Sequence, residues 1–362
     1  MKVLLAGDWH SQVHEEPVAN ALGFLGHAVE RFAWHRYFVR PERGPLCVAR
    51  HFARRVENKY VLGPSIRRLN GDLVREAKRV RPELLFIYRG THVLPESLRT
   101  IRRVAPAAII AGYNNDDPFS PRASKRMWRH LLRGLPEYHI MFAYRHANVE
   151  QFLEAGARRA ALLRSWFIPE RMRPVTPTAV EQERYGSDVT FIGHYEADGR
   201  VEMLKAIVDR RIRLRLFGPG KGEGSGDWDG AIGAFEQMRH LVPVRPVWNE
   251  DYNKALCGAK IALCFLSKLN RDTYTRRCFE IPASGTLMLS EYTPDLATLF
   301  KEGVEADFFR SEAELVEKVE YYLANEEVRG RVADAGRRRV IADGHDVVSR
   351  MREMLSHIEA LR

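Results

Sequence analysis

Two stretches of the chain open in the same way, and this duplication limits the possible folds more than any other feature. Lys2–Gly7 and Asp188–Gly193 are short β-type runs that end in glycine and continue into a polar loop and a helical pattern. Short apolar runs follow each opening, at residues 83–88, 107–112, 139–144 and 160–163, and then at 212–217, 260–265 and 286–289. Such runs, separated by helices of roughly 10–15 residues, are typical of buried parallel strands. The sequence therefore predicts an α/β fold with two doubly wound domains in tandem.

Proline marks the boundary between the two predicted domains. Residues 169–187 contain three prolines and show no hydrophobic periodicity, which is typical of a linker. We predict a first domain over 1–168 and a second domain over 188–345. Apolar residues at helical spacing then predict a final helix over 346–362.

Composition limits the setting in which the chain works. It carries 57 Lys and Arg against 47 Asp and Glu, a formal charge of +10, and four cysteines with no CxxC pair. Its apolar runs fall far short of the roughly 18 residues needed to cross a bilayer. We expect reduced thiols and a soluble protein of the cytoplasm.

The densest cationic stretch, residues 31–81, also contains aromatic residues: Trp34, Tyr37, Phe38, Phe52 and Tyr60. Basic residues interleaved with aromatics suit an interfacial surface, for which Arg54, Arg55, Arg67 and Arg68 are the candidate contacts. A solvated basic face, or a basic helix pair packed on a sheet, gives the same pattern. The sequence leaves these interpretations open.

The most informative segment for chemistry runs from Asn270 to Gly285, between two predicted strands. It should form a strand-end loop and the first turns of a helix. Asp272 and Glu280 lie eight positions apart, with three arginines around them: Arg271, Arg276 and Arg277. Carboxylates accept hydrogen bonds from sugar diols, and arginines bind phosphate oxygens. A core helix with a mixed-charge surface is the alternative interpretation of this segment.

A second candidate site is Gly193-His194-Tyr195 with Arg200. Glycine lets backbone N–H groups approach a diphosphate at a helix N-terminus, and an arginine adds positive charge. A tight turn with a surface arginine would look the same. The glycines over residues 218–226 match neither phosphate-loop pattern and predict a flexible loop.

Polar residues also follow the predicted strands of the first half. Asp116 and Asp117 come after the run 107–112 and could orient an acceptor hydroxyl or act as a base; a structural Asx turn before Pro118 fits equally well. Arg89 follows the run 83–88 in the same way.

Two other chemistries lack support in the sequence. His10 and His14 are four positions apart, but there is no HExxH pattern and no convincing third ligand, so we expect no metal site. A Ser-His-Asp hydrolase is disfavoured because the chain has no GxSxG motif.

The segment Asn270–Gly285, with Met288–Asp295 and Phe300–Phe309, resembles the CgeB-type, spore-maturation-protein-like glycosyltransferases. These are GT-B transferases related to retaining glycosyltransferase family four. Looser likenesses at 114–119, 142–156 and 188–195 extend the resemblance across most of the chain. It implies two Rossmann-like domains facing a central cleft that holds a nucleotide sugar, with the final helix returning toward the first domain.

The resemblance also implies roles for individual residues. Related transferases carry a Glu-x7-Glu motif, in which the first carboxylate holds the donor sugar and the second holds the ribose. Glu280 matches the second position, and the shorter Asp272 stands at the first. The family's diphosphate-binding Arg and Lys have no match, and Arg276 and Arg200 are the substitutes chosen by position and chemistry.

The full set of expected site residues has three groups. The catalytic candidates are Asp272, Arg276 and Asp117. The donor-binding candidates are Gly193, His194, Tyr195, Arg200, Asn270, Arg271, Thr275 and Glu280. The acceptor-side candidates are His10, Arg89 and Asp116.

The implied activity is transfer of a sugar from a nucleoside-diphosphate sugar to a hydroxyl acceptor, with retention of configuration, in cell-envelope or other surface glycan synthesis. Arginines and helix-terminal N–H groups can stabilise the leaving diphosphate, so we expect no cofactor and no metal requirement. The acceptor would be a glycan, a lipid-linked molecule or a protein, with peripheral contact to an anionic membrane at its inner face and no nucleic-acid partner. A non-catalytic nucleotide- or polyanion-binding protein and a nucleotide-sugar epimerase are the alternatives.

Overall fold

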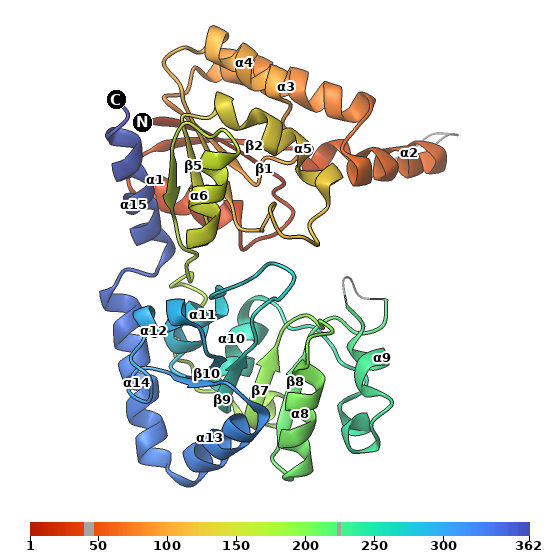
Figure 1. Ribbon diagram of the computed structural model, residues 1–362, viewed down its shortest axis with the longest axis vertical. Coiled ribbons are helices and arrows are strands. Elements are labelled where there is room, and N and C mark those ends of the chain that lie inside the picture. The colour runs from red at the N-terminus through yellow and green to blue at the C-terminus, as the bar shows by residue number, and fades with distance from the viewer. Residues whose placement is uncertain (40–46, 223–225) are drawn as a thin grey trace. The chain divides into compact units, whose positions relative to one another are not determined.

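The computed structural model describes residues 1–39, 47–222 and 226–362 (Figure 1). Residues 40–46 of the cationic stretch and 223–225 of the glycine-rich loop lie outside the described residues. The chain forms two compact units: unit 1 comprises Met1–Ser165 with Val347–Arg362, and unit 2 comprises Trp166–Asp346. Each unit is built on a parallel sheet with helices around it, which confirms the predicted α/β fold class.

The sheet of unit 1 has the strand order β2-β1-β3-β4-β5-β6, with every pair parallel. Its strands are β1 (Lys2–Gly7), β2 (Ala28–Ala33), β3 (Leu84–Tyr88), β4 (Ile109–Asn114), β5 (Ile140–Ala143) and β6 (Ala160–Leu162). The central strands are buried on both faces, which explains their continuous apolar sequences.

The helices of unit 1 connect and cover these strands. They are α1 (Glu15–Phe24), α2 (Cys47–Tyr60), α3 (Pro64–Val80), α4 (Pro95–Val104), α5 (Lys125–Gly134), α6 (His146–Glu154) and α15 (Val347–Glu359), with short 3-10 turns η1 (His35–Tyr37) and η2 (Leu135–Glu137). Helix α3 packs on α4 and α4 packs on α5, whereas α15 packs against α1. The final helix buries Met351, Met354 and Ile358, so its apolar stripe belongs to the core of unit 1.

The sheet of unit 2 has the order β11-β10-β9-β7-β8, again with parallel pairs. Its strands are β7 (Ser187–Ile192), β8 (Leu214–Phe217), β9 (Ala259–Cys264), β10 (Leu287–Glu291) and β11 (Asp307–Phe309). Its helices are α7 (Ala179–Tyr185), α8 (Arg200–Asp209), α9 (Trp228–Ile232), η3 (Glu236–Leu241), α10 (Asn249–Cys257), α11 (Arg277–Ala283), α12 (Pro294–Leu299), α13 (Glu312–Ala324) and α14 (Glu326–Ala342). Helix α8 packs on α13, and α11 packs on α14.

The stretch expected to be an aperiodic linker contains a short helix, α7, and belongs to unit 2. Thr178 starts the helix: its hydroxyl accepts the Glu181 N–H at 3.3 Å, and the Glu181 carboxylate accepts the Thr178 N–H at 2.8 Å. This reciprocal cap stabilises seven residues that are too few to show a helical period. Within the described ranges, no helix combines the length and the apolar character needed to cross a membrane.

Candidate functional site

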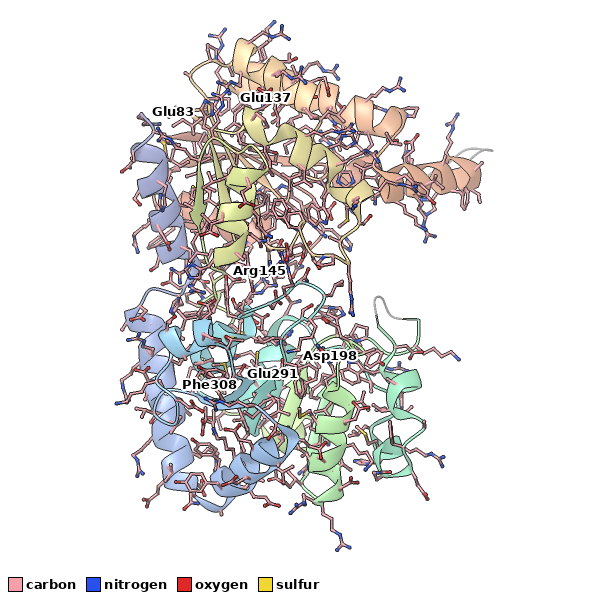
Figure 2. The ribbon with its side chains drawn as sticks, in the orientation of Figure 1. Glu83, Glu137, Arg145, Asp198, Glu291 and Phe308 are labelled. Atoms are coloured by element: carbon pink, nitrogen blue, oxygen red, sulfur yellow. The ribbon has the colours of Figure 1, made fainter. Side chains whose placement is uncertain are left out.

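The carboxyl ends of the parallel strands of unit 2 meet along one edge of its sheet, and the predicted donor residues lie in the loops there. The loop after β7 runs to the start of α8, and the loop after β9 runs to the start of α11. Asp198, in the first loop, and Glu291, which ends β10, are labelled in Figure 2. Parallel α/β sheets bind ligands at this edge because the loops and helix N-termini gather there.

Glu280 lies at the middle of α11 and is buried. Its Oε2 accepts a hydrogen bond from the Tyr252 hydroxyl at 2.8 Å, and its Oε1 lies 3.4 Å from Arg276 Nε. Burial, reinforced by the neighbouring Glu280 carboxylate, raises the pKa of Tyr252 well above its ordinary value, so its hydroxyl stays a donor. A carboxylate has about four lone-pair sites, and these contacts leave room for a diol.

Tyr252 was not among the residues expected from the sequence. It lies near the N-terminal end of α10, and Trp248, the residue before that helix, is 66% exposed. An aromatic side chain this exposed, four residues before Tyr252, is a candidate surface for a nucleobase. The signal available in the sequence was the motif Val247-Trp248-Asn249 between two predicted elements, which by itself is weak.

A hydrogen-bond network joins the loop of Asp272 to the loop of Arg200. Ser267 accepts the Asn270 N–H on its Oγ at 3.2 Å and the Asp272 N–H on its carbonyl at 2.9 Å. The same Ser267 hydroxyl donates to Glu196 Oε2 at 3.1 Å. The structure therefore ties together the two loops that carry the predicted donor residues.

The remaining predicted residues of the two loops have mixed roles. Arg271 adopts a positive φ of 49°, which fixes a sharp bend after the turn at Ser267. Thr275 accepts the Cys278 N–H on its carbonyl at 2.9 Å, so its backbone helps to start α11. His194 is exposed, whereas the Tyr195 ring packs edge-on against Trp228 at 5.4 Å.

Arg200 is buried and bound to acidic residues of its own loop. Its Nε and Nη2 donate to the two carboxylate oxygens of Asp198 at 2.7 and 2.6 Å, and its Nη1 donates to the His194 carbonyl at 2.6 Å. These contacts hold the loop after β7 in shape and neutralise the guanidinium charge. The geometry favours a positioning role for Arg200 over the direct diphosphate contact that we expected.

Arg277 has the free charge that Arg200 lacks. Its Nη2 donates to the Phe265 carbonyl at a long 3.5 Å, its Nε is buried without a partner, and in the described chain no carboxylate lies within ion-pairing distance. A Cβ added to Gly193 would come within 3.4 Å of Arg277 Nη1. The missing side chain at Gly193 thus leaves this guanidinium close to the backbone that follows β7.

Acceptor-side candidates lie at the carboxyl edge of the unit 1 sheet, where β1, β3 and β4 are neighbours. Arg89, after β3, pairs with Asp116, after β4, at 2.5 Å. Arg89 also adopts a positive φ of 69°, uncommon for a residue with a side chain, and such strain often occurs at functional sites. His10, after β1, stacks on His35 with ring centroids 4.5 Å apart.

Asp117 accepts hydrogen bonds from within its own unit. It is buried, and its Oδ1 accepts the Phe119 N–H at 3.0 Å and the Asn148 amide at 2.9 Å. The geometry therefore favours the Asx-turn interpretation over the catalytic base that we expected at this position. Asp116 is the partly exposed carboxylate of this loop.

Three buried polar atoms at the same edge of unit 1 lack a hydrogen-bond partner: Trp9 Nε1, Asn114 Nδ2 and Asn115 Oδ1. Buried polar groups are almost always paired, so a cluster of exceptions indicates a place for a polar ligand or water. Glu15 holds the backbone beside them, since its Oε1 accepts the Asp8 N–H at 2.8 Å, and burial raises the pKa of Glu15. Trp9 was not singled out from the sequence, and Asn115 entered only as part of the run 114–119.

The sequence and the structure of this chain are similar to known glycosyltransferases. Residues 200–356 match the model of a family described as glycosyl transferase-like. That match covers the helices and loops of unit 2 from α8 onward and most of α15. No curated protein matches the chain.

Solved structures match over the whole chain. Sucrose-phosphate synthase from Thermosynechococcus elongatus superposes with a TM-score of 0.72 at 12% identity, covering 100% of both chains. A glycosyltransferase from Rickettsia africae gives 0.69 at 12% identity, covering 99% of this chain and 98% of that one. Anabaena Alr3699/HepE, solved in complex with UDP-glucose, gives 0.68 at 12% identity, covering 99% and 100%. The fold is that of the GT-B glycosyltransferases.

Proposed function

We propose that the protein is a glycosyltransferase that uses a nucleoside-diphosphate sugar and binds its nucleotide at the carboxyl edge of the unit 2 sheet. The observation that carries the proposal is Glu280, a buried carboxylate held by Tyr252 and Arg276 at the position where the resemblance expects a ribose contact. HepE, a protein of the same fold, is solved with UDP-glucose, so UDP is the first nucleotide to test.

In this proposal Arg277 binds the diphosphate and stabilises the negative charge that develops when the glycosidic bond to the donor breaks. A fixed guanidinium in a partly buried site stabilises such charge because little reorganisation is needed at the moment of reaction. Arg276 already pairs with Glu280, so in this proposal Arg277 is the main contact of the diphosphate and Arg276 is at most a second one. Asp272 holds the donor sugar from the loop that Ser267 fixes.

The acceptor hydroxyl binds at the carboxyl edge of unit 1 in the same proposal. The Arg89–Asp116 pair and the unpartnered Trp9, Asn114 and Asn115 atoms supply donors and acceptors for a polyhydroxylated molecule. Either Asp116 or the donor phosphate takes the acceptor proton. Retention of configuration, the likeness to CgeB-type enzymes and a role in surface glycan synthesis are further parts of this proposal.

Calorimetry with UDP tests the nucleotide site. Glu280→Gln should weaken UDP binding by about 1.5–3 kcal/mol, since a charged hydrogen bond to the ribose is lost. Glu317→Gln is the matched control, because Glu317 is an exposed carboxylate of α13. Equal UDP affinity in wild type and Glu280→Gln would refute the assignment.

Turnover separates the transferase from the non-catalytic alternative. We expect release of UDP or another nucleoside diphosphate from a panel of nucleotide sugars, faster when hydroxyl acceptors are present. Nucleotide binding with no hydrolysis, transfer or epimerisation across the panel would favour a binding protein. Epimerisation of the donor without an acceptor would favour the epimerase.

A further inference from the structure

Helix α2 turns its apolar side chains outward. Val48 is 68% exposed, Phe52 69% and Val56 39%, and the spacing of four places all three on one face of the helix. Arg55 and Lys59 lie on the same face, because they flank this stripe at helical spacing. We call these five residues the α2 outer face. In Figure 1, α2 extends away from the rest of unit 1.

The opposite face of α2 is polar and fastens the helix to unit 1. Arg54 Nη1 donates to the Val39 carbonyl at 3.0 Å, and Glu57 Oε2 accepts the Ser65 N–H at 3.1 Å. Asn58 Oδ1 lies 2.7 Å from His92 Nε2, in the loop after β3. The helix is therefore inverted relative to an ordinary surface helix, which buries its apolar face and solvates its polar one.

The charge of the α2 outer face restricts what can cover it. Arg55 and Lys59 are both cationic, and the helix's acidic residue, Glu57, faces unit 1. At the end of the helix the Arg126 guanidinium lies 5.2 Å from the Tyr60 ring and adds a further cation. A second copy of the chain would set these cations against their own copies, which opposes a symmetric dimer.

We propose that the α2 outer face binds the headgroup region of an anionic lipid bilayer, with Val48, Phe52 and Val56 entering the acyl boundary. Helices that lie in a membrane interface combine an apolar face with cations that meet anionic headgroups. The polar anchoring of α2 leaves this apolar stripe free for the lipid. The proposal concerns unit 1 alone and does not depend on the proposed transferase activity.

The structure changes which arginines should matter. Of the candidates expected from the sequence, Arg54 binds the Val39 carbonyl and is not available to lipid. Arg67 and Arg68 are exposed on α3, outside the α2 outer face. The cations expected to contact headgroups are therefore Arg55 and Lys59.

Vesicle co-sedimentation of the full chain tests the proposal. We expect binding to vesicles of one-third phosphatidylglycerol in phosphatidylcholine, weak binding to phosphatidylcholine alone, and release from the anionic vesicles near ~0.5 M salt. Val48→Ser with Phe52→Ser should weaken binding at least about tenfold, since two apolar side chains leave the acyl boundary. Arg55→Gln with Lys59→Gln should weaken it by about 25-fold, because each of the two cations near an anionic surface contributes about a fivefold factor.

Matched controls use equally exposed residues elsewhere. Phe24→Ser removes an aromatic side chain that is 76% exposed on α1, and Arg331→Gln with Arg338→Gln removes two exposed cations from α14. Both should bind vesicles like wild type. All four variants alter exposed positions, and circular dichroism checks that each is folded.

Hydrogen exchange locates the contact on the chain. Amide protons of α2 should exchange more slowly with anionic vesicles present, whereas those of α14 should not change. Absence of binding to anionic vesicles at low salt would overturn the proposal. So would binding that the α2 variants retain, or a wild-type dimer that Phe52→Ser dissociates without lipid.

Discussion

Removing the hydroxyl of Tyr252 tests the arrangement around Glu280 most directly. In Tyr252→Phe the Glu280 Oε2 loses its 2.8 Å donor while the ring stays in place. A hydrogen bond to a charged group contributes about 1.5–3 kcal/mol, and little water can replace it because Glu280 is buried. For a domain the size of unit 2, each kcal/mol corresponds to roughly 2–4 °C in Tm, so we expect a fall of about 3–12 °C.

The same variant should change nucleotide recognition. If Tyr252 orients Glu280 toward the ribose, the preference for UDP over its 2′-deoxy analogue should fall about tenfold, which corresponds to about 1.4 kcal/mol. Isothermal titration of both nucleotides measures this ratio. In a double-mutant cycle with Glu280→Gln, the coupling energy should lie between about 0.5 and 3 kcal/mol.

Tyr322 supplies the matched control. Its hydroxyl donates to Asp307 Oδ2 at 2.7 Å, a tyrosine–carboxylate bond of the same kind in the same unit but on α13 and β11. Tyr322→Phe should lower the Tm by a similar amount and leave nucleotide affinity unchanged. If the two variants affect UDP binding equally, or if Tyr252→Phe leaves the ribose preference intact, Tyr252 has a purely structural role and the reasoning fails.

The other predictions concern three positions. Arg277→Ala should weaken UDP binding at least about tenfold while leaving uridine binding unchanged, as measured by calorimetry, because a charged hydrogen bond to phosphate is lost; equal loss for both would contradict a diphosphate contact. Trp248→Ala should weaken both UDP and uridine by about 1–3 kcal/mol if the base stacks on the indole, and unchanged uridine affinity would exclude stacking. Burial lowers the pKa of His92 to about 4. Between about pH 6.5 and pH 4 the unfolded chain therefore binds a proton at His92 that the folded chain does not bind, so stability should fall as the pH drops through this range. Denaturant unfolding at several pH values should show that the free energy of unfolding declines by about 1–3 kcal/mol over this range, and that His92→Gln reduces the decline. If the free energies of wild type and His92→Gln change with pH in parallel, His92 does not have this role.

Buried strands were the most predictable part of the fold. The expected runs at 2–7, 83–88 and 260–265 coincide with β1, β3 and β9 to within a residue, because a strand covered on both faces must be apolar throughout. The sheet edges gave no such signal. Strand β2 has exposed or half-buried polar residues at Glu30 and Arg31, and β11 is three residues long.

Helix caps were predictable where they depend on neighbouring residues. A threonine directly before a proline, as at Thr293-Pro294, predicts a helix start, and Thr293 accepts the Leu296 N–H and begins α12. The spacing Ser311-x-x-Glu314 predicts a capping box, and half of it forms: the Ser311 hydroxyl accepts the Glu314 N–H, but the Glu314 carboxylate accepts the Arg310 N–H instead. The choice between two adjacent backbone donors depends on the approach of the chain, which the local sequence does not specify.

The arginines show why the site was harder to predict than the fold. Arg200 and Arg277 lie equally close to the Phe191 ring, 5.9 Å from its centroid, yet Arg200 is neutralised and Arg277 is not. For Arg200 the local sequence indicates the neutralisation, because Asp198 and Glu196 precede it by two and four residues and both bind it. An arginine this close in sequence to two acidic residues is a poor candidate for a phosphate contact.

Glu280 illustrates the opposite case, in which sequence spacing cannot decide. Arg276 and Arg277 precede it by four and three residues, and either spacing places an arginine beside a glutamate on a helix. The structure pairs Arg276 with Oε1 of Glu280, and the Tyr252 hydroxyl donates to Oε2. Tyr252 comes from α10, a different element, so this contact joins residues 28 positions apart and cannot be predicted from the local sequence. Because Arg276 pairs with Glu280 and Arg277 has no carboxylate within ion-pairing distance in the described chain, Arg277 is the residue to test for the diphosphate.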